Sequence, residues 1–185
     1  MKKLIAITFV FLAFFSCLKE ETPGTAPELP PAETMIIDFS RFSDSKKSAV
    51  FEKTNWLYSA TTVGVWNVII GTTFAVPVAA FKTAFNHQPE QTGDLTWQWH
   101  YTVNGFTSQY TARLVGEVQS GQVKWEMYIS KTDIDSFDEF LWFEGTSVIG
   151  GKSGQWILYH SADFPDKTVQ IDWKKEAEEV GEIKY

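Results

Sequence analysis

The sequence predicts an α+β fold: a curved antiparallel β-meander or barrel-like sheet of six or more strands, packed around buried N-terminal helices. From Asp94 onward, apolar and polar residues alternate with a period of two, and turn signals separate the runs. Between Lys53 and Lys82 lie 28 residues without one formal charge. A twisted sheet that is apolar on one face closes into a barrel or curls around a filler, and this uncharged segment is the expected filler.

The composition favours one folded domain and excludes one class of partner. Hydrophobic residues make up 44% and aromatic residues 16% of the 185-residue chain, which is enough to bury a core. The formal net charge of −7 repels phosphate backbones, so we expect no nucleic acid partner.

Residues 1–16 are typical of a secretory signal peptide. Two lysines precede an apolar run in which only Thr8 is polar, and the small Ser16 ends the segment. Such a run is too short, and wrongly flanked, for a membrane-spanning helix.

The only cysteine of the chain, Cys17, follows directly. Ser16-Cys17 resembles the lipobox of bacterial lipoproteins, in which a small residue precedes a cysteine that is diacylated and becomes the first residue of the mature chain. Phe14 stands where that family prefers leucine. The alternative is a free thiol that is discarded with the signal peptide. The resemblance implies lipidation of Cys17, and acyl chains anchor a protein to a membrane without spanning it.

Residues 17–33 are expected to form a lipidated, proline-rich tether. Leu18, Lys19, Glu20 and Glu21 resemble the sorting signal with which one Gram-negative phylum exports lipoproteins to the outer face of the outer membrane. A solvated charged tether is the simpler interpretation of the same residues. The rest of the segment holds four prolines and no aromatic residue, which is typical of an extended spacer.

Residues 34–185 are expected to form a single β-rich domain, which opens with a strand in TMIIDFSRF and a helix N-cap at Ser43-Asp44-Ser45. The uncharged segment 54–81 is expected to hold two buried helices, the first ending near Gly71 and the second carrying Pro77 near its first turn. Two alternatives stay open: a membrane-spanning helix, and strands in VWNVIIG and TTFAVPV.

Six strands are expected in the alternating region. The turns between them are expected at Asn104-Gly105, as a type I′ hairpin, and at Ser120-Gly121, Gly150-Gly151 and Pro165-Asp166. Ile183 and Tyr185 look like the opening of a further strand, either a short one or one cut by truncation. In architecture alone, this arrangement is similar to calycin-like barrels and to helix-plugged half-barrels of bacterial lipoproteins.

No metal site and no cofactor are expected. The histidines at 87, 100 and 160 lie far apart in the chain, and zinc-ligand spacings are missing. The nearest candidate is an acidic stretch that lacks the glycine and the spacing of a calcium loop. A solvated hairpin tip is the better interpretation of its four acids, Asp133, Asp135, Asp138 and Glu139.

No catalytic residues are expected, and the chain is not expected to be an enzyme. The nearest approach to a hydrolase site is Glu126 and Glu144 on neighbouring strands. His100 could meet Glu126 or His160 across strands, but the alternation places it on the polar face, toward solvent.

Aromatic residues are the candidate ligand-binding groups. Tryptophan recurs along the strands, where it most simply fills the core. Tyr128 and Tyr159 are expected on the opposite face. Trp142 lies in FLWF, a stretch that is apolar on both sides and therefore needs a cover, from the helices or from a partner.

These features predict a non-catalytic binding or interaction module at the cell surface, held in the outer membrane by its lipid anchor. Its partner would be an unknown protein, a glycan or an apolar ligand. The alternative is a carrier of a lipid or other apolar molecule inside the curved sheet, and a hydrolase is less favoured than either.

Overall fold

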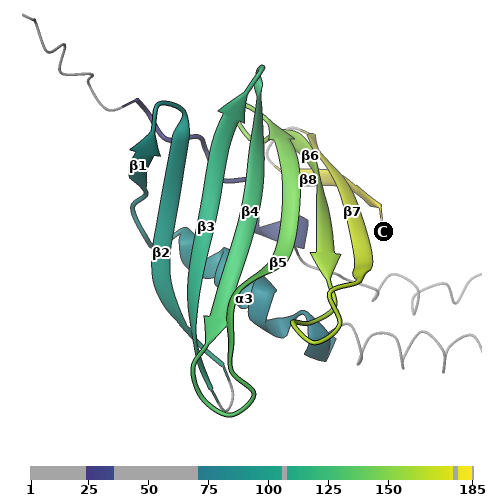
Figure 1. The fold of residues 1–185 in the computed structure, drawn as a ribbon. Coiled ribbons are helices and arrows are strands. Elements are labelled where there is room, and N and C mark those ends of the chain that lie inside the picture. The colour runs from purple at the N-terminus through teal and green to yellow at the C-terminus, as the bar shows by residue number, and fades with distance from the viewer. Residues whose placement is uncertain (1–23, 36–70, 106–107, 177–178, 185) are drawn as a thin grey trace, which may run out of the picture.

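The computed structural model describes residues 24–35, 71–105, 108–176 and 179–184 (Figure 1). The predictions for the signal peptide, for Cys17 and for its sorting residues lie outside the described residues. So do the predictions for a strand after Met35, for the N-cap and for most of the first helix of the uncharged segment, of which residues 71–73 are described and helical.

An eight-stranded antiparallel sheet makes up most of the fold. The strands follow one another in chain order, and the sheet is curved and open, because among the described residues each strand pairs only with its neighbours in the chain (Figure 1). This meander confirms the predicted fold class. The strands are β1 (Glu90–Gly93), β2 (Thr96–Asn104), β3 (Gln109–Gln119), β4 (Gln122–Lys131), β5 (Phe137–Val148), β6 (Ser153–Tyr159), β7 (Lys167–Glu176) and β8 (Glu179–Lys184).

The six expected strands are β2 to β7, and β8 lies where the pattern at Ile183 indicated a further strand. The sequence did not predict β1. Its four residues, EQTG, are all exposed and include no apolar side chain, so they carry no alternation.

The period of two sorts the side chains onto a concave apolar face and a convex polar face. In β4, for example, Val123, Trp125, Met127 and Ile129 are buried, and the residues between them are more exposed. The same alternation in β2 buries Trp97, Trp99, Tyr101 and Val103. The core of the domain therefore lies in the hollow of the sheet.

The turn between β3 and β4 is the two-residue hairpin that the sequence predicted at Ser120-Gly121. Gln119 pairs with Gln122 across it. Both turn residues have positive φ, 48° at Ser120 and 83° at Gly121, as a type I′ turn requires.

The predicted type I′ turn at Asn104-Gly105 is wrong. Asn104 is still in β2 and pairs with Gln109, so four residues connect the strands, and Gly105 N–H donates to the carbonyl of Ser108 at 2.8 Å. In this register the small Gly116 lies opposite Trp97. A Cβ on Gly116 would lie 2.7 Å from the ring of Trp125, so only glycine fits there.

Helix α3 (Ala75–Ala84) confirms the second expected helix and excludes a strand in VPV. Pro77 lies in its first turn, where the missing N–H costs no helical hydrogen bond. The helix packs against β2, β3 and β4 in the hollow of the sheet (Figure 1). Phe81 contacts the rings of Phe143 and Trp156 edge-on, at 5.9 and 5.3 Å between centroids. Among the described residues, no helix is both long and apolar enough to cross a membrane.

Tyr101 joins the helix to the sheet. Its hydroxyl donates to the carbonyl of Ala80 at 2.8 Å. Burial raises the pKa of this hydroxyl well above its usual value, so the donor keeps its proton.

The described N-terminal residues pack on the domain. The short 3₁₀ helix η1 (Ala32–Met35) buries Thr34 and Met35, so these two residues are not in the strand that was expected to begin there. Thr34 Oγ1 accepts a hydrogen bond from the indole of Trp156 at 3.0 Å. Further upstream, Gly24 N–H donates to Gln91 Oε1 at 3.0 Å. From Gly24 onward, the expected spacer is therefore in contact with the sheet.

A β-bulge in β5 explains the doubly apolar stretch FLWF. Met127 pairs with Phe143 and Tyr128 pairs with Leu141, so Trp142 is an extra residue in β5. The bulge shifts the alternation by one residue, and Trp142 and Phe143 are consequently both buried. This part of β5 therefore needs no separate cover on its convex side.

Candidate binding surface on the convex face

The convex face carries the candidate site, and the register of the sheet positions its side chains. From β3 to β6, strand pairing sets Val115, Glu126, Glu144 and Ile157 side by side in one row. Residues two positions away along each strand form the neighbouring rows of the same face. Polar and aromatic side chains from four strands thus form one continuous surface.

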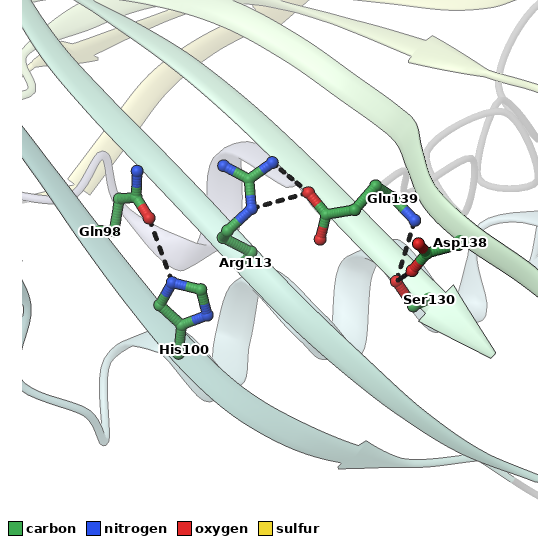
Figure 2. A network of polar contacts seen from close by, with 6 residues as sticks. All are labelled: Gln98, His100, Arg113, Ser130, Asp138 and Glu139. Carbon is green, nitrogen blue, oxygen red and sulfur yellow. Dashed lines mark hydrogen bonds and ion pairs between the residues drawn. The ribbon is translucent and has the colours of Figure 1, made fainter. Parts of the chain in front are cut away.

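Arg113 is the centre of one polar network on this surface (Figure 2). Its guanidinium contacts Glu139 Oε2 through Nε at 2.7 Å and more closely through Nη2. It also lies over the ring of Tyr128, 4.2 Å from the centroid. On the adjacent strand, His100 shares a hydrogen bond of 3.1 Å with the Gln98 side chain.

A second bulge in β5 turns Glu139 toward Arg113. Ser130 in β4 faces two residues, Asp138 and Glu139, and Glu139 has a left-handed φ of 46°. The Ser130 hydroxyl accepts from Glu139 N–H at 2.9 Å and donates to Asp138 Oδ1 at 2.8 Å (Figure 2). A left-handed residue other than glycine costs about 1–2 kcal/mol, so these contacts hold a strained backbone in place.

Glu126 and Glu144 are direct cross-strand partners, as their positions in the meander predicted. Like charges in such a pair repel each other, but each carboxylate has a cation nearby. Lys124 Nζ lies 2.7 Å from Glu126, and Lys167 Nζ lies 3.6 Å from Glu144. The hydrogen bond to Glu126 raises the pKa of Lys124, which outweighs the opposite effect of partial burial.

Two tyrosines flank this pair of acids. The Tyr159 hydroxyl donates to Glu144 Oε1 at 2.7 Å. Burial, and then the hydrogen bond to Glu144, raise the pKa of Tyr159 to about 12. Burial and the nearby Glu126 also raise the pKa of Tyr128. Both phenols therefore stay protonated and serve as neutral donors at physiological pH.

An open groove of about 420 Å³ lies on the convex face, at the end of the sheet that carries the β3–β4 turn. Its volume falls within the range of small-molecule sites. Amide and hydroxyl side chains are the most numerous in its lining, which consists of Gln119, Ser120, Gln122, Lys124, Glu144, Gly145, Thr146, Gln155 and Ile157.

The structure separates the three aromatic residues that the sequence singled out. Tyr128 and Tyr159 lie on the convex face, as expected, and both are partly exposed. Trp142 is only 7% exposed and packs in the hollow of the sheet, against Phe137 at 5.7 Å and Phe140 at 5.5 Å. The bulge at Trp142 causes this separation.

The acidic stretch has other partners than a metal ion. Asp133 pairs with Lys131 at 3.4 Å, and Asp138 and Glu139 belong to the network around Ser130 and Arg113. Asp135 lies in the loop between β4 and β5 with a φ of 56°. Across the described part of the chain, no three His, Cys, Asp or Glu side chains are grouped so that they could hold a metal ion.

The histidines do not meet one another or the acid pair. His100 and His160 are both exposed, as the alternation predicted for His100. His160 lies edge-on to Phe164 at 6.3 Å, whereas His87 stacks on Tyr101 at 4.9 Å.

The glutamines of the groove were missed by the sequence reasoning. The sequence pattern could have found them, since Gln119 and Gln122 flank the predicted turn and Gln155 lies at an outward position of its strand. Comparison with protein-family models, with curated proteins and with solved structures finds no match to this chain.

Proposed function

We propose that this chain is a lipid-anchored, non-catalytic binding module at the outer face of the outer membrane, which engages its partner through the convex face of the sheet. The lipobox-like Ser16-Cys17 and the residues Leu18 to Glu21 support the anchor and the address. The convex face is proposed as the recognition surface because the open groove lies there, whereas the concave face is filled by the core.

The observation that carries the proposal is that the hollow is filled and the open groove lies outside. Trp125, Trp156 and Phe81 are fully buried in the hollow. The two indole N–H groups are hydrogen-bonded within the protein, and that of Trp125 donates to Ser147 Oγ at 2.9 Å. A carrier of apolar molecules needs a largely apolar, enclosed cavity. The groove of about 420 Å³ is instead open to solvent and has glutamine, serine and threonine side chains in its lining, which favours a binding module over a carrier.

Several charged and aromatic side chains beside the groove are also held in place before any partner arrives. Arg113, Tyr128 and Glu139 fix one another by an ion pair and a cation–π contact, and Glu144 is held by Tyr159 and Lys167. Side chains that are already ordered lose less conformational entropy on binding, which is a property of effective recognition surfaces.

The anchor is tested with Cys17→Ser in a Gram-negative host. We expect this variant to incorporate no acyl label and to leave the membrane fraction, because the acyl chains on Cys17 are the proposed anchor. Recovery of Cys17→Ser in the membrane fraction would contradict the proposal. A companion variant with alanine at Lys19, Glu20 and Glu21 should still incorporate the acyl label, but a protease added outside the cells should no longer cleave it.

A further inference from the structure

The groove on the convex face offers unpaired hydrogen-bonding groups of both kinds. Within the described residues, the side chains of Gln119, Gln122 and Thr146 make no hydrogen bond to the protein. Each amide supplies two donor hydrogens and one acceptor oxygen, and the hydroxyl supplies one donor and two acceptor sites. Gln155 uses one amide hydrogen on Asp172 at 2.6 Å and keeps its carbonyl oxygen for other partners.

The two charged residues of the lining are already neutralised. Lys124 pairs with Glu126 at 2.7 Å, and Glu144 accepts from Tyr159 and lies near Lys167. A charged ligand would have to compete with these pairs. The groove therefore favours a ligand that is uncharged and rich in groups that both donate and accept hydrogen bonds.

One apolar side chain completes the lining. Ile157 lies between Gln155 and Tyr159 on the outer face of β6. The isoleucine side chain offers apolar contact area to the C–H face of a ring that carries hydroxyl groups at its rim. Amides, a hydroxyl and such an apolar surface together match the two kinds of surface that a sugar ring presents.

We propose that the groove between the β3–β4 turn and β6 binds a neutral sugar, as the end or a short stretch of a glycan. This deepens the proposed function, on which it rests, by naming the class of partner. Gln119, Gln122, Thr146 and Gln155 bind the hydroxyl groups, and Ile157 packs against the ring.

The test is a titration of the purified full chain with neutral sugars, followed by ¹H–¹⁵N NMR of the glutamine side-chain amides. The probes are glucose, galactose, mannose and N-acetylglucosamine, with their disaccharides. We expect at least one of them to shift the amide signals of Gln119, Gln122 and Gln155 in a saturable manner. We also expect Thr146→Val to weaken that sugar about fivefold, because it removes one hydrogen bond and keeps the shape of the side chain.

The matched control is Thr111→Val, an exposed threonine on the same face and outside the groove. It should leave the affinity unchanged. Three results would overturn the proposal: no sugar of the panel shifts the groove amides, Thr111→Val weakens binding as much as Thr146→Val, or only extended peptides shift these signals. Acyl labelling and fractionation of the wild-type chain are unaffected by any of these results, so a failure of the sugar site is distinguishable from a failure of the anchored module.

Discussion

The concave and convex faces of this sheet are built from the same strands, one residue apart, but the concave face is packed and the convex face is open to solvent. On the concave face, the indoles of Trp125 and Trp156 donate to buried hydroxyls of Ser147 and Thr34. On the convex face, ion pairs and hydrogen bonds surround an open groove. Stability is therefore concentrated on the concave face, and the side chains of the convex face are free to vary with the partner.

The largest expected effect of a substitution is on the concave face, at Trp156. Its ring is fully buried and lies 5.3 Å from the rings of Phe81 and of Phe143. Trp156→Ala should lower the free energy of unfolding by about 3–5 kcal/mol, because it leaves a large cavity between the helix and the sheet. Denaturant unfolding followed by circular dichroism measures this loss. A loss below that of the surface variant Tyr159→Phe would break the distinction between the faces.

A smaller effect is expected at Thr34, which tests whether the N-terminal segment belongs to the folded domain. Thr34→Val keeps the shape of the side chain and removes the acceptor of the Trp156 indole. The buried N–H is then unpaired, which costs about 1–3 kcal/mol. Thr111→Val, on the exposed face, is the control in the same unfolding experiment. Equal stability of the two variants would mean that the hydrogen bond from Trp156 to Thr34 contributes nothing to stability.

The smallest effect is expected on the convex face, at Tyr159. At neutral pH, Tyr159→Phe removes one partly exposed hydrogen bond to Glu144 and should change stability by less than about 1 kcal/mol. The pKa of Tyr159 is raised from 10.0 to about 12 in the folded state. Its contribution to stability is therefore fully present below pH 10 and is lost as the pH rises toward 12.

The difference between wild type and Tyr159→Phe isolates this contribution from that of other tyrosines. We expect the unfolding free energy of the wild type to fall more steeply than that of the variant between pH 10 and pH 12. Parallel curves over this interval would show that the pKa of Tyr159 is not raised in the folded state.

Most of the sheet was predictable, because strict alternation from Trp97 onward fixes both the strands and their faces. β1 was not predictable, since four exposed polar residues carry no such pattern. The prediction of a two-residue turn at Asn104-Gly105 was wrong, because strand pairing and not the local dipeptide sets the register there. Local turn preference favoured that dipeptide, whereas the pairing of β2 with β3 joins Asn104 to Gln109 and leaves a longer loop.

The candidate site was predictable only in part. Alternation placed Tyr128 and Tyr159 on the outer face and paired Glu126 with Glu144. The position of Trp142 was not predictable, because a bulge is decided by the pairing of β4 with β5 and has no marker in FLWF. The groove depends on residues from four strands that are brought together only by the register of the whole meander.

The central claim is that the convex face is presented outside the cell while the concave face stays packed. The chain has a single cysteine, Cys17, which the proposed acylation blocks, so introduced cysteines report without background. The measurement is labelling of Thr146→Cys and of Leu158→Cys on intact cells with a maleimide that does not cross membranes. Thr146 is exposed and Leu158 is fully buried. We expect Thr146→Cys to be labelled on intact cells and Leu158→Cys only after denaturation. Labelling of Thr146→Cys only after lysis, or of Leu158→Cys in the native protein, would contradict it.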